Sequence, residues 1–327
     1  MSRRLPFVSV VVPIFNRRNY VRQQLTSLQN LTYPRDCFEV IVVDNGSTDG
    51  AWEDACAIAS ASDFPLRCYR NPSDLRVPSA SRNYGVRQAK GEIVAFTDSD
   101  CTVSPGWLTA AASAFTHGVG IVYGRTVSDA DAVKPVLHHT LTVDSRRTYA
   151  ETCNIFYVRD VVVRAGGFDE SLASVLKGPV WGEDTDLAYR VIELGYRGIF
   201  CDDAIVVHKV VPSSFRSWLL EPLRAGPWAK VVKRHPRIRQ DLLFNRIFCT
   251  RMTALFDLML AGALLSLAFG WPFLLLVIPF LCAKYAEGGH HLSFGMRVLR
   301  LGGGSVRAFL LFCTLMYSSV RYRSLVL

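Results

Sequence analysis

The stretch Ile93-Val94-Ala95-Phe96-Thr97-Asp98-Ser99-Asp100 places two carboxylates, one residue apart, directly after an apolar run. The run predicts a buried strand that ends where the aspartates begin. Carboxylates at such a place are costly unless a cation meets them. Oxygen ligands suit Mg²⁺ or Mn²⁺, so the stretch is compatible with a metal site that faces phosphate. A polar corner between strand and loop is the alternative, because Asp-x-Asp strings are common in turns.

The residues before this stretch have the pattern of repeated strand and helix units. Phe7–Ile14 and Glu39–Asp44 are short apolar runs, and each precedes a segment with helical spacing, Arg17–Leu31 and Trp52–Ala61. Two such units so close together predict a parallel sheet with right-handed crossovers. The expected fold class is therefore α/β, with a mostly parallel sheet flanked by helices.

The remaining elements of this domain follow from the same patterns. They are expected at Leu66–Tyr69 (strand), Ser79–Gln88 (helix), Glu92–Thr97 (strand), Trp107–Phe115 (helix), Gly120–Val127 and Thr152–Val158 (strands), Arg159–Gly166 and Asp184–Leu194 (helices) and Gly198–Val207 (strand). The polar stretch Asp169–Gly182 is expected to be a mobile loop that orders on ligand binding.

Polar residues follow three of the expected strands. Ligands of open parallel sheets collect beyond the carboxyl ends of the strands, so Asn16, Asp44 and the two aspartates of the opening stretch should converge on one crevice. No Gly-x-Gly-x-x-Gly string follows the first strand, which disfavours a dinucleotide site.

Charge and hydropathy are both concentrated in the second half of the chain. The 327 residues carry a net charge of +9 and have a mean hydropathy of +0.20. Ser213–Arg251 holds nine Lys or Arg against two acids, and Met252–Ala283 has Asp257 as its only charged residue. A basic segment beside an apolar one is typical of a collar on anionic cytoplasmic lipid, and less typical of a nucleic-acid groove. A solvated helix face is the alternative.

These changes in charge and hydropathy along the chain predict three parts: an α/β domain over 1–212, a basic helical juxtamembrane region over 213–251 and a membrane-associated segment over 252–327. Met252–Phe269 and Trp271–Ala283 predict a helical hairpin, with one kinked helix as the alternative. The hairpin is favoured because the arginines after it would then lie on the same side of the membrane as the basic region.

The last apolar segment and the first residues of the chain complete the expected topology. Val306–Val320 is short, so it is expected to be re-entrant, interfacial or a thin third crossing. Met1–Pro6 leads directly into a strand, so no signal peptide is expected and the α/β domain should stay on the cytoplasmic side. The nine cysteines show no Cys-x-x-Cys spacing and are expected to be reduced core residues.

Several strings carry a more specific signal when they are taken in order. They are Val8-Ser-Val-Val-Val-Pro-Ile-Phe-Asn16, Val40-Ile-Val-Val-Asp-Asn-Gly-Ser-Thr-Asp49, Ser81-Arg-Asn-Tyr-Gly85, Lys90–Asp100, Gly166-Gly-Phe-Asp-Glu170 and Gly182–Arg190. Their order and spacing resemble family 2 glycosyltransferases, which are inverting enzymes of the GT-A fold. The resemblance covers about residues 7 to 210 and implies a GT-A-type, Rossmann-like mixed sheet, here followed by a C-terminal membrane anchor.

By this resemblance, the nucleotide lies at the ends of the first two strands. Pro13 and Asn16 would lie beside it, and Asp44 would accept a hydrogen bond from the base. A carboxylate there suits a uracil-type N–H. An Asx turn between Asp44 and Gly46 is the alternative.

The diphosphate and a divalent metal, Mg²⁺ or Mn²⁺, are assigned by the same resemblance. Arg82 would lie near the diphosphate, where a guanidinium matches phosphate oxygens, and Ser99 belongs to the same donor-binding group. Asp98 would face the ribose and the metal shell, and Asp100 would bind the metal directly. His208, after the last strand, would complete the metal site. An exposed helix arginine and a structural histidine are the alternatives for Arg82 and His208.

Asp184 resembles the general base of the family. An inverting displacement needs one carboxylate on the face opposite the leaving group to take the proton of the acceptor hydroxyl. Glu183, beside it, would help to raise its pKa towards neutrality. The alternative is that these acids only favour a helix N-terminus.

The function expected from these residues is transfer of a sugar by a membrane-anchored inverting glycosyltransferase. The donor would be a nucleoside diphosphate sugar, with a UDP-sugar favoured, and the acceptor a lipid-linked or cell-surface saccharide precursor. No Gln-x-x-Arg-Trp string appears, so addition of a single sugar is favoured over polymerisation. No nucleic-acid partner is expected.

Two other functions stay open. One is a non-catalytic sugar-nucleotide-binding partner of another transferase. The other is a haloacid-dehalogenase-type phosphatase, because Asp98-Ser-Asp-Cys-Thr102 also fits an Asp-x-Asp-x-Thr string. In that superfamily the nucleophile follows the first strand, whereas here two strand and helix units precede Asp98, which argues against a phosphatase.

Overall fold

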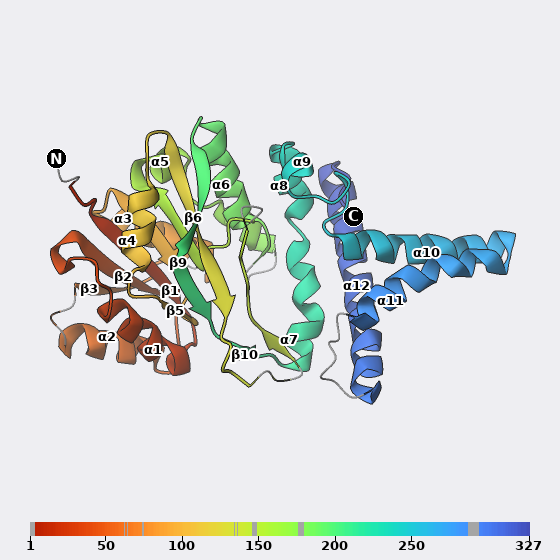
Figure 1. Ribbon diagram of the computed structural model, residues 1–327, viewed down its shortest axis with the longest axis horizontal. Helices are drawn as coiled ribbons and strands as arrows, with labels where there is room; N and C mark the ends of the chain where they lie inside the picture. The colour runs from red at the N-terminus through yellow and green to blue at the C-terminus, as the bar shows by residue number, and fades with distance from the viewer. Residues whose placement is uncertain are drawn as a thin grey trace. The chain divides into compact units, whose positions relative to one another are not determined.

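The computed structural model describes residues 4–327 except 62, 64, 74, 134, 136, 146–148, 176–179 and 287–293. The chain divides into two compact units (Figure 1). The α/β unit comprises Met1–Pro179 and Glu183–Ser213, and the helical unit comprises Val180–Gly182 and Ser214–Leu327. The assignment of residues 180–182 to the helical unit was not expected from the sequence.

The α/β unit is built on an eight-stranded sheet with the order β3-β2-β1-β4-β8-β6-β9-β5. Its strands are β1 (Val8–Ile14), β2 (Phe38–Asp44), β3 (Leu66–Arg70), β4 (Ile93–Thr97), β5 (Cys101–Val103), β6 (Val119–Ser128), β8 (Asn154–Val158) and β9 (Arg197–His208). Strands β1 to β4 are mutually parallel, and β9 is parallel to β6. Strand β8 runs antiparallel to β4 and β6, and β5 antiparallel to β9. The sheet is therefore mixed and mostly parallel, as the sequence predicted.

Helices cover both faces of this sheet. They are α1 (Arg18–Gln29), α2 (Ala51–Ala61), α3 (Pro78–Gln88), α4 (Trp107–Ala114), α5 (Arg159–Arg164) and α6 (Glu183–Glu193), with 3₁₀ turns η1 (Arg35–Cys37) and η2 (Glu170–Val175). Helices α1, α2 and α4 pack on one face, and α3, α5 and α6 on the other. In β4, Ile93 and Ala95 face the first set, whereas Val94 and Phe96 face the second. Burial on both faces explains why the run Ile93–Phe96 at the start of this stretch is apolar at every position.

Three short strands near the end of β9 were not predicted from the sequence. Strand β5 is only three residues long, and it places Cys101 opposite His208. Strands β7 (His138–His139) and β10 (Val211–Pro212) form a separate antiparallel pair. Strand β5 thus brings the second aspartate of the opening stretch beside the last residue of β9.

The stretch Asp169–Gly182 differs from the mobile loop that the sequence predicted. Its first part is η2, and Leu172 and Ala173 in that turn are buried. Residues 176–179 lie outside the described residues. The last three, Val180–Gly182, belong to the helical unit.

The helical unit contains a hairpin of apolar helices. Its elements are α7 (Phe215–Leu220), η3 (Glu221–Ala225), α8 (Trp228–Arg234), α9 (Ile238–Asp241), α10 (Arg251–Phe269), η4 (Trp271–Val277), α11 (Ile278–Ala286) and α12 (Phe294–Tyr322). Helix α10 turns at Gly270, and η4 and α11 run back beside it (Figure 1). A Cβ at Gly262 would lie 2.6 Å from Leu276 Cβ, so this glycine permits the close approach of the two halves.

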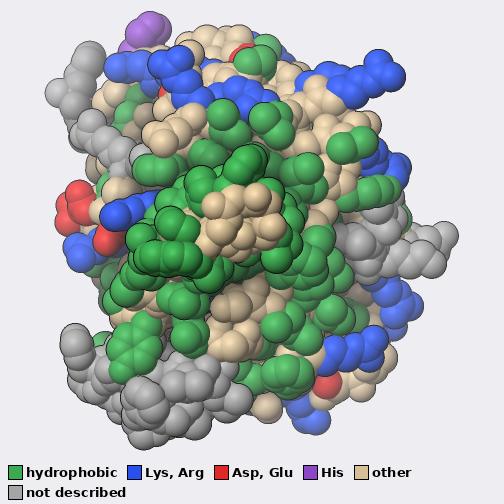
Figure 2. All heavy atoms as spheres, turned by 90° about the vertical axis from the view of Figure 1, so that its right-hand side faces the viewer, with side chains coloured by type: hydrophobic (Ala, Val, Ile, Leu, Met, Phe, Trp, Pro, Cys, Tyr) green, Lys and Arg blue, Asp and Glu red, His purple; other side chains and the backbone are tan. Residues whose placement is uncertain are grey.

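Among the described residues, two helices are long and apolar enough to cross a membrane: α10 and the part Leu301–Tyr322 of α12. Hydrophobic side chains gather over the hairpin (Figure 2), where Leu267 is 85% exposed and Trp271 71% exposed. Helix α12 is longer than the short segment expected at Val306–Val320. The predicted segment began too late in the chain because three consecutive glycines and two arginines before Val306 interrupt the apolar pattern.

The cysteines only partly match the expectation of core residues. All nine are free; Cys101, Cys153 and Cys249 are buried, whereas Cys282 and Cys313 are exposed. The exposed pair lies on α11 and α12, whose apolar residues do not all face the interior of the unit.

Candidate active site

Asp44 ends β2 with a fully buried carboxylate. The carboxylate accepts hydrogen bonds from the backbone N–H groups of Gly46 (3.2 Å) and Ser47 (3.1 Å). Arg70 Nε lies 4.0 Å from it. The Asx turn considered from the sequence therefore exists, and Asp44 shapes the loop after β2 whatever else it binds. Its contact with a nucleotide base stays a prediction.

Asn16 connects the loops that follow β1 and β2. Its backbone has a φ of 50°, its Oδ1 accepts a hydrogen bond from Thr48 N–H (2.8 Å), and its own N–H donates to Ser47 Oγ (3.0 Å). Pro13 pairs with Val43 in the register of β1 and β2. The residues expected beside the nucleotide thus do lie together at the carboxyl ends of adjacent parallel strands.

Arg82 binds two carboxylates that come from distant segments. Its guanidinium lies 2.9 Å from Asp98 Oδ1, just after β4, and 2.9 Å from Glu183 Oε1, at the start of α6. Arg82 is only 5% exposed, so the alternative of an exposed helix arginine is wrong. Glu183 is buried as well, and burial raises its pKa even though Arg82 opposes the shift. One guanidinium therefore joins the Asp-x-Asp segment to the helix of the expected base.

Asp100 and His208 form the centre of a group that could hold a metal ion. Asp100 Oδ1 lies 3.8 Å from His208 Nε2, and both residues are buried. His208 Nδ1 lies 2.8 Å from the carbonyl oxygen of Lys209. A carbonyl can only accept, so Nδ1 carries the proton and the lone pair of Nε2 is directed to the Asp100 side. This is the tautomer and the kind of support that a metal-binding histidine uses.

Cys101 is a third member of this group that sequence reasoning missed. Its sulfur lies within 4.8 Å of the Asp100 and His208 ligand atoms. A hydrogen bond with the Cys153 side chain and burial raise the pKa of the Cys101 thiol well above its usual value, so it stays protonated. A thiol is also a soft ligand, whereas Mg²⁺ and Mn²⁺ prefer oxygen and imidazole. The donor set that fits these cations is therefore the Asp100 carboxylate and His208.

Asp98 and Ser99 are the other two residues of the Asp-x-Asp segment. Asp98 was expected to share the metal, but in the described structure its Oδ1 is paired with Arg82 and it is not part of the metal-capable group. Ser99 is buried between the two aspartates. Asp100 Oδ2 also has Arg17 Nε at 3.6 Å.

Asp184, the expected base, is the second residue of α6. Its Oδ1 accepts a hydrogen bond from the N–H of Thr185 at 2.8 Å. Burial, followed by the nearby charges of Glu183 and Glu151, raises the pKa of Asp184 to about 8. Glu183 thus acts in the direction that the sequence analysis expected. A carboxyl with this pKa can exchange a proton near neutral pH.

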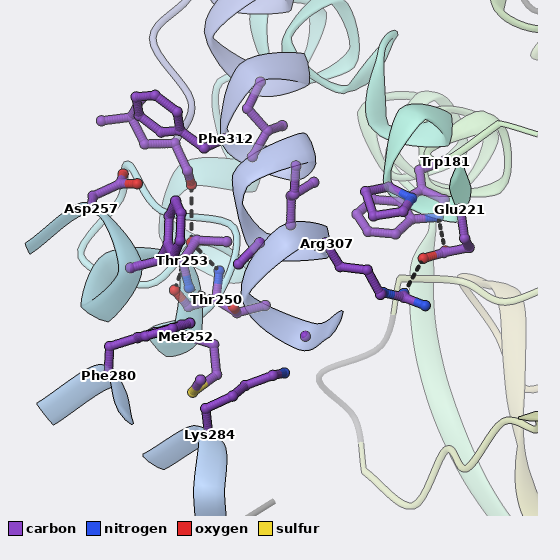
Figure 3. A pocket seen from close by; sticks show the side chains of 17 residues that line it. Trp181, Glu221, Thr250, Met252, Thr253, Asp257, Phe280, Lys284, Arg307 and Phe312 are labelled. Carbon is purple, nitrogen blue, oxygen red and sulfur yellow. Dashed lines mark hydrogen bonds and ion pairs between the residues drawn. The ribbon is translucent and has the colours of Figure 1, made fainter. Parts of the chain in front are cut away.

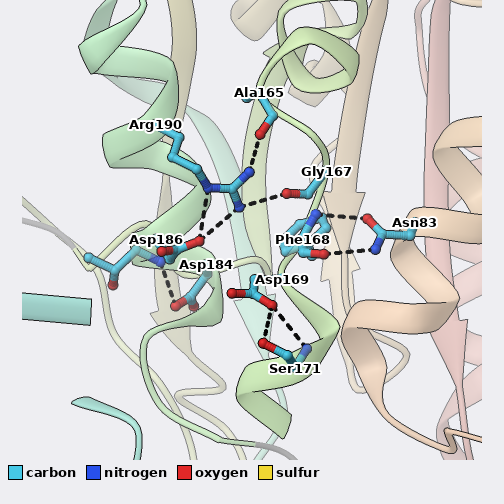
Figure 4. A network of polar contacts seen from close by, with 10 residues as sticks. Asn83, Ala165, Gly167, Phe168, Asp169, Ser171, Asp184, Asp186 and Arg190 are labelled. Atoms are coloured by element: carbon cyan, nitrogen blue, oxygen red, sulfur yellow. Dashed lines mark hydrogen bonds and ion pairs between the residues drawn. The ribbon is translucent and has the colours of Figure 1, made fainter. Parts of the chain in front are cut away.

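Helix α6 is fixed to the Gly166–Glu170 turn by Arg190 (Figure 4). Arg190 Nε donates to Asp186 Oδ2 (2.9 Å), and its two terminal nitrogens donate to the carbonyl oxygens of Gly167 (2.6 Å) and Ala165. Asp186 is fully buried. No role was predicted for Arg190 from the sequence, although the i, i+4 spacing of Asp186 and Arg190 is a signal of such an ion pair.

Asn83 fixes helix α3 to the same turn. Its side chain donates to Phe168 O (2.9 Å) and accepts from Phe168 N–H (2.8 Å), as Figure 4 shows. A Cβ at Gly167 would lie 2.6 Å from Asn83 Oδ1, and Gly167 has a φ of +68°. The helix that carries Arg82 and the helix that carries Asp184 are therefore both held to one glycine turn.

Comparisons with known proteins bear on the family to which this chain belongs. The family model described as glycosyl transferase family 2 matches residues 9–168. Glycosyltransferase AglE of Haloferax volcanii is 32% identical over 235 residues, which cover 69% of this chain and 74% of that protein. The chain belongs to glycosyltransferase family 2. The phosphatase alternative is not favoured by this membership.

Two further proteins are similar over most of this chain. The pre-mycofactocin glycosyltransferase of Mycobacterium tuberculosis is 32% identical over 253 residues, 70% of this chain but only 48% of that protein. The solved structure of mannosyltransferase PcManGT from Pyrobaculum calidifontis, in complex with GDP-Man and Mn²⁺, superposes with a TM-score of 0.57 at 22% identity and covers 98% of this chain and 88% of that one. This likeness confirms the expected α/β fold of the GT-A type.

Proposed function

We propose that this glycosyltransferase is a membrane-anchored, inverting enzyme that moves one sugar from a nucleoside diphosphate donor to a lipid-linked or cell-surface saccharide acceptor. The observation that carries the proposal is the pair of contacts made by Arg82, 2.9 Å from Asp98 and 2.9 Å from Glu183. Through it, the segment expected to bind the donor and the helix that begins with the base belong to one site.

Asp184 is the general base of this proposal. As the acceptor hydroxyl oxygen bonds to the anomeric carbon, the bond from that carbon to the diphosphate oxygen breaks. The nucleoside diphosphate leaves with the bonding electron pair, and the hydroxyl proton passes to Asp184. Attack from the face opposite the leaving group inverts the anomeric configuration. The raised pKa of about 8 supports this role, because such a carboxylate holds a proton well once it has accepted it.

Asp100 and His208 would hold the Mg²⁺ or Mn²⁺ ion, with Asp98 beside them. When bound, the ion neutralises negative charge on the departing diphosphate. The His208 tautomer fixed by Lys209 supports this assignment. Arg82 keeps Asp98 oriented and offsets its charge.

Asp44, Asn16, Pro13 and Ser99 would surround the nucleotide. Among the contacts described, the Asp44 carboxylate meets only backbone N–H groups and, at 4.0 Å, Arg70. Its oxygens can therefore still accept a hydrogen bond from an N–H of the base. A uracil base is favoured on this ground, so a UDP-sugar is the first donor to test. GDP-mannose belongs in the same test because PcManGT was solved with it.

The helical unit would anchor the enzyme to the cytoplasmic side of the membrane. Helix α10 and Leu301–Tyr322 supply two candidate crossings, and the nine basic residues of Ser213–Arg251 supply charge for anionic lipid. A tethered catalytic unit meets a lipid-linked acceptor at a raised effective concentration. This supports a membrane-associated acceptor.

A donor panel tests the proposal. Detergent-purified protein with Mn²⁺ or Mg²⁺ is scored for nucleoside diphosphate release from several sugar nucleotides, with and without membrane lipid extract. The wild type is compared with Asp184→Asn and with Asp203→Asn, a control that removes an exposed carboxylate from β9. We expect release from one donor that lipid extract increases and only Asp184→Asn abolishes. Donor binding without turnover in the wild type would instead support the non-catalytic partner.

A further inference from the structure

The chain that leads into the base is held by the helical unit. Val180–Gly182 belong to that unit, whereas Glu183 begins α6 of the α/β unit. The backbone N–H of Trp181 donates to Arg224 O at 2.9 Å, and its indole Nε1–H donates to Glu221 Oε1 at 3.1 Å. Trp181, two residues before Glu183, is therefore anchored within the helical unit.

Gly182, the last residue of this segment, is also fixed by the helical unit. Its φ is +94°, a conformation that other residues rarely adopt. A Cβ at this position would lie 2.8 Å from Trp228 Cε3, and Trp228 is itself buried in α8. Close packing therefore holds Gly182 within the helical unit, as hydrogen bonds hold Trp181.

From Glu221 the contacts continue into α12. Glu221 Oε2 lies 2.7 Å from a terminal nitrogen of Arg307, whose other terminal nitrogen donates to Trp218 O at 2.6 Å. The Arg307 guanidinium also lies 4.7 Å from the centroid of the Trp218 ring. Figure 3 shows Arg307 reaching from α12 towards Glu221 and Trp181. Charge-assisted bonds between partly buried groups are among the stronger polar contacts in proteins.

We infer that Trp181, Glu221 and Arg307 are positioning residues for sugar transfer. Held together within the helical unit, they limit the positions open to Asp184, the base of the proposed function on which this inference rests. Asp184 follows Trp181 by three residues, about 10 Å of chain at most, so the position of Trp181 limits where the base can lie. A misplacement of about 1 Å can cost roughly 100-fold in rate. The helical unit thereby contributes to the reaction in addition to anchoring.

Three substitutions and one control separate this role from a general loss of structure. Trp181→Phe keeps an aromatic ring and removes only the indole N–H, whereas Glu221→Ala removes the acceptor for both Trp181 and Arg307. Asp241→Ala is the matched control, because it breaks an exposed ion pair of the same unit, 3.0 Å from Arg237. Arg307→Lys keeps the charge but cannot make both of the arginine contacts.

The measurement is kcat for transfer in the full-length protein in detergent, with donor Kd and donor-binding stoichiometry taken in parallel. Stoichiometry gives the folded fraction, to which kcat is normalised. We expect kcat to fall roughly 10-fold in Trp181→Phe and up to about 100-fold in Glu221→Ala, with donor Kd unchanged. The kcat of Arg307→Lys should lie between those of wild type and Glu221→Ala, and the kcat of the control should match that of wild type.

The outcomes distinguish this inference from the proposed function. If Asp184→Asn loses transfer while Trp181→Phe and Glu221→Ala keep the wild-type kcat, the positioning role is refuted and the base stands. If Asp184→Asn keeps transfer, the base assignment itself falls. A parallel loss of donor affinity and kcat would show that the segment serves donor binding and would overturn the inference. If Glu221→Ala does not fold, Trp181→Phe decides.

Discussion

Replacing Asp184 by Asn should change how the stability of the protein depends on pH. In the folded protein, burial first and then Glu183 and Glu151 raise the pKa of this carboxyl from 3.8 to about 8. The folded state therefore holds a proton that the unfolded chain releases above pH 4. The stabilisation from that proton is fully present below pH 4 and is lost as the pH rises towards 8.

The size of the effect follows from the pKa difference. About four pKa units at 1.36 kcal/mol each give an upper limit of about 6 kcal/mol. Asp184 is only partly buried. Solvent screening therefore reduces the expected loss in the free energy of unfolding to about 3 kcal/mol between pH 5 and pH 8. Asn carries no proton to release, so the Asp184→Asn protein should lose about 3 kcal/mol less than wild type over this range.

The assay is urea unfolding in detergent at pH 5 and at pH 8, followed by tryptophan fluorescence. Asp203→Asn, which removes an exposed carboxylate, should keep the pH dependence of the wild type. The same pH dependence in Asp184→Asn and wild type would refute the claim that Asp184 is protonated in the folded protein at neutral pH. In transfer assays the wild-type kcat/KM should rise with pH towards a midpoint near 8, because the free enzyme needs the ionised base.

Three further predictions concern the rest of the site. Asp100→Ala or His208→Ala should remove the dependence of donor binding on Mn²⁺ or Mg²⁺ in calorimetric titrations, and unchanged metal dependence would contradict the assignment. Asp44→Ala should reduce discrimination between UDP and GDP in competition assays while metal dependence persists; unaltered discrimination would leave Asp44 a turn residue only. Arg82→Ala should lower the free energy of unfolding by about 3 kcal/mol, because it leaves the buried Glu183 and the partly buried Asp98 without their cation, whereas Arg87→Ala on the exposed side of α3 should cost little.

The sheet and its polar edge could be predicted because buried strands have a plain signature. The apolar runs of β1, β2 and β4 end at polar residues, and parallel strands bring such ends to one edge. The expected fold class is confirmed on this basis. Strand β5 was missed because three residues carry no periodicity, yet it is the element that sets Cys101 opposite His208.

Other features depended on contacts that no local pattern contains. Arg82 is buried because Asp98 and Glu183, 16 and 101 residues away in the chain, neutralise it. Residues 180–182 belong to the helical unit through Trp181 and Gly182, whose partners come later in the sequence. The length of α12 was underestimated because its three glycines interrupt an apolar pattern. A side chain at Gly303 would meet Trp218, and one at Gly304 would meet Lys284.

The three acids at the start of α6 differ in their partners, and the difference supports Asp184 as the proposed base. Asp186 is paired with Arg190 at 2.8 Å, and Glu183 with Arg82 at 2.9 Å. In the part of the chain that the structure describes, Asp184 makes no ion pair and accepts only the N–H of Thr185. A paired carboxylate is a poor base because its cation stabilises the ionised form. Asp184 is raised in pKa by burial and by its acidic neighbours, so it is the member of the three suited to accept a proton.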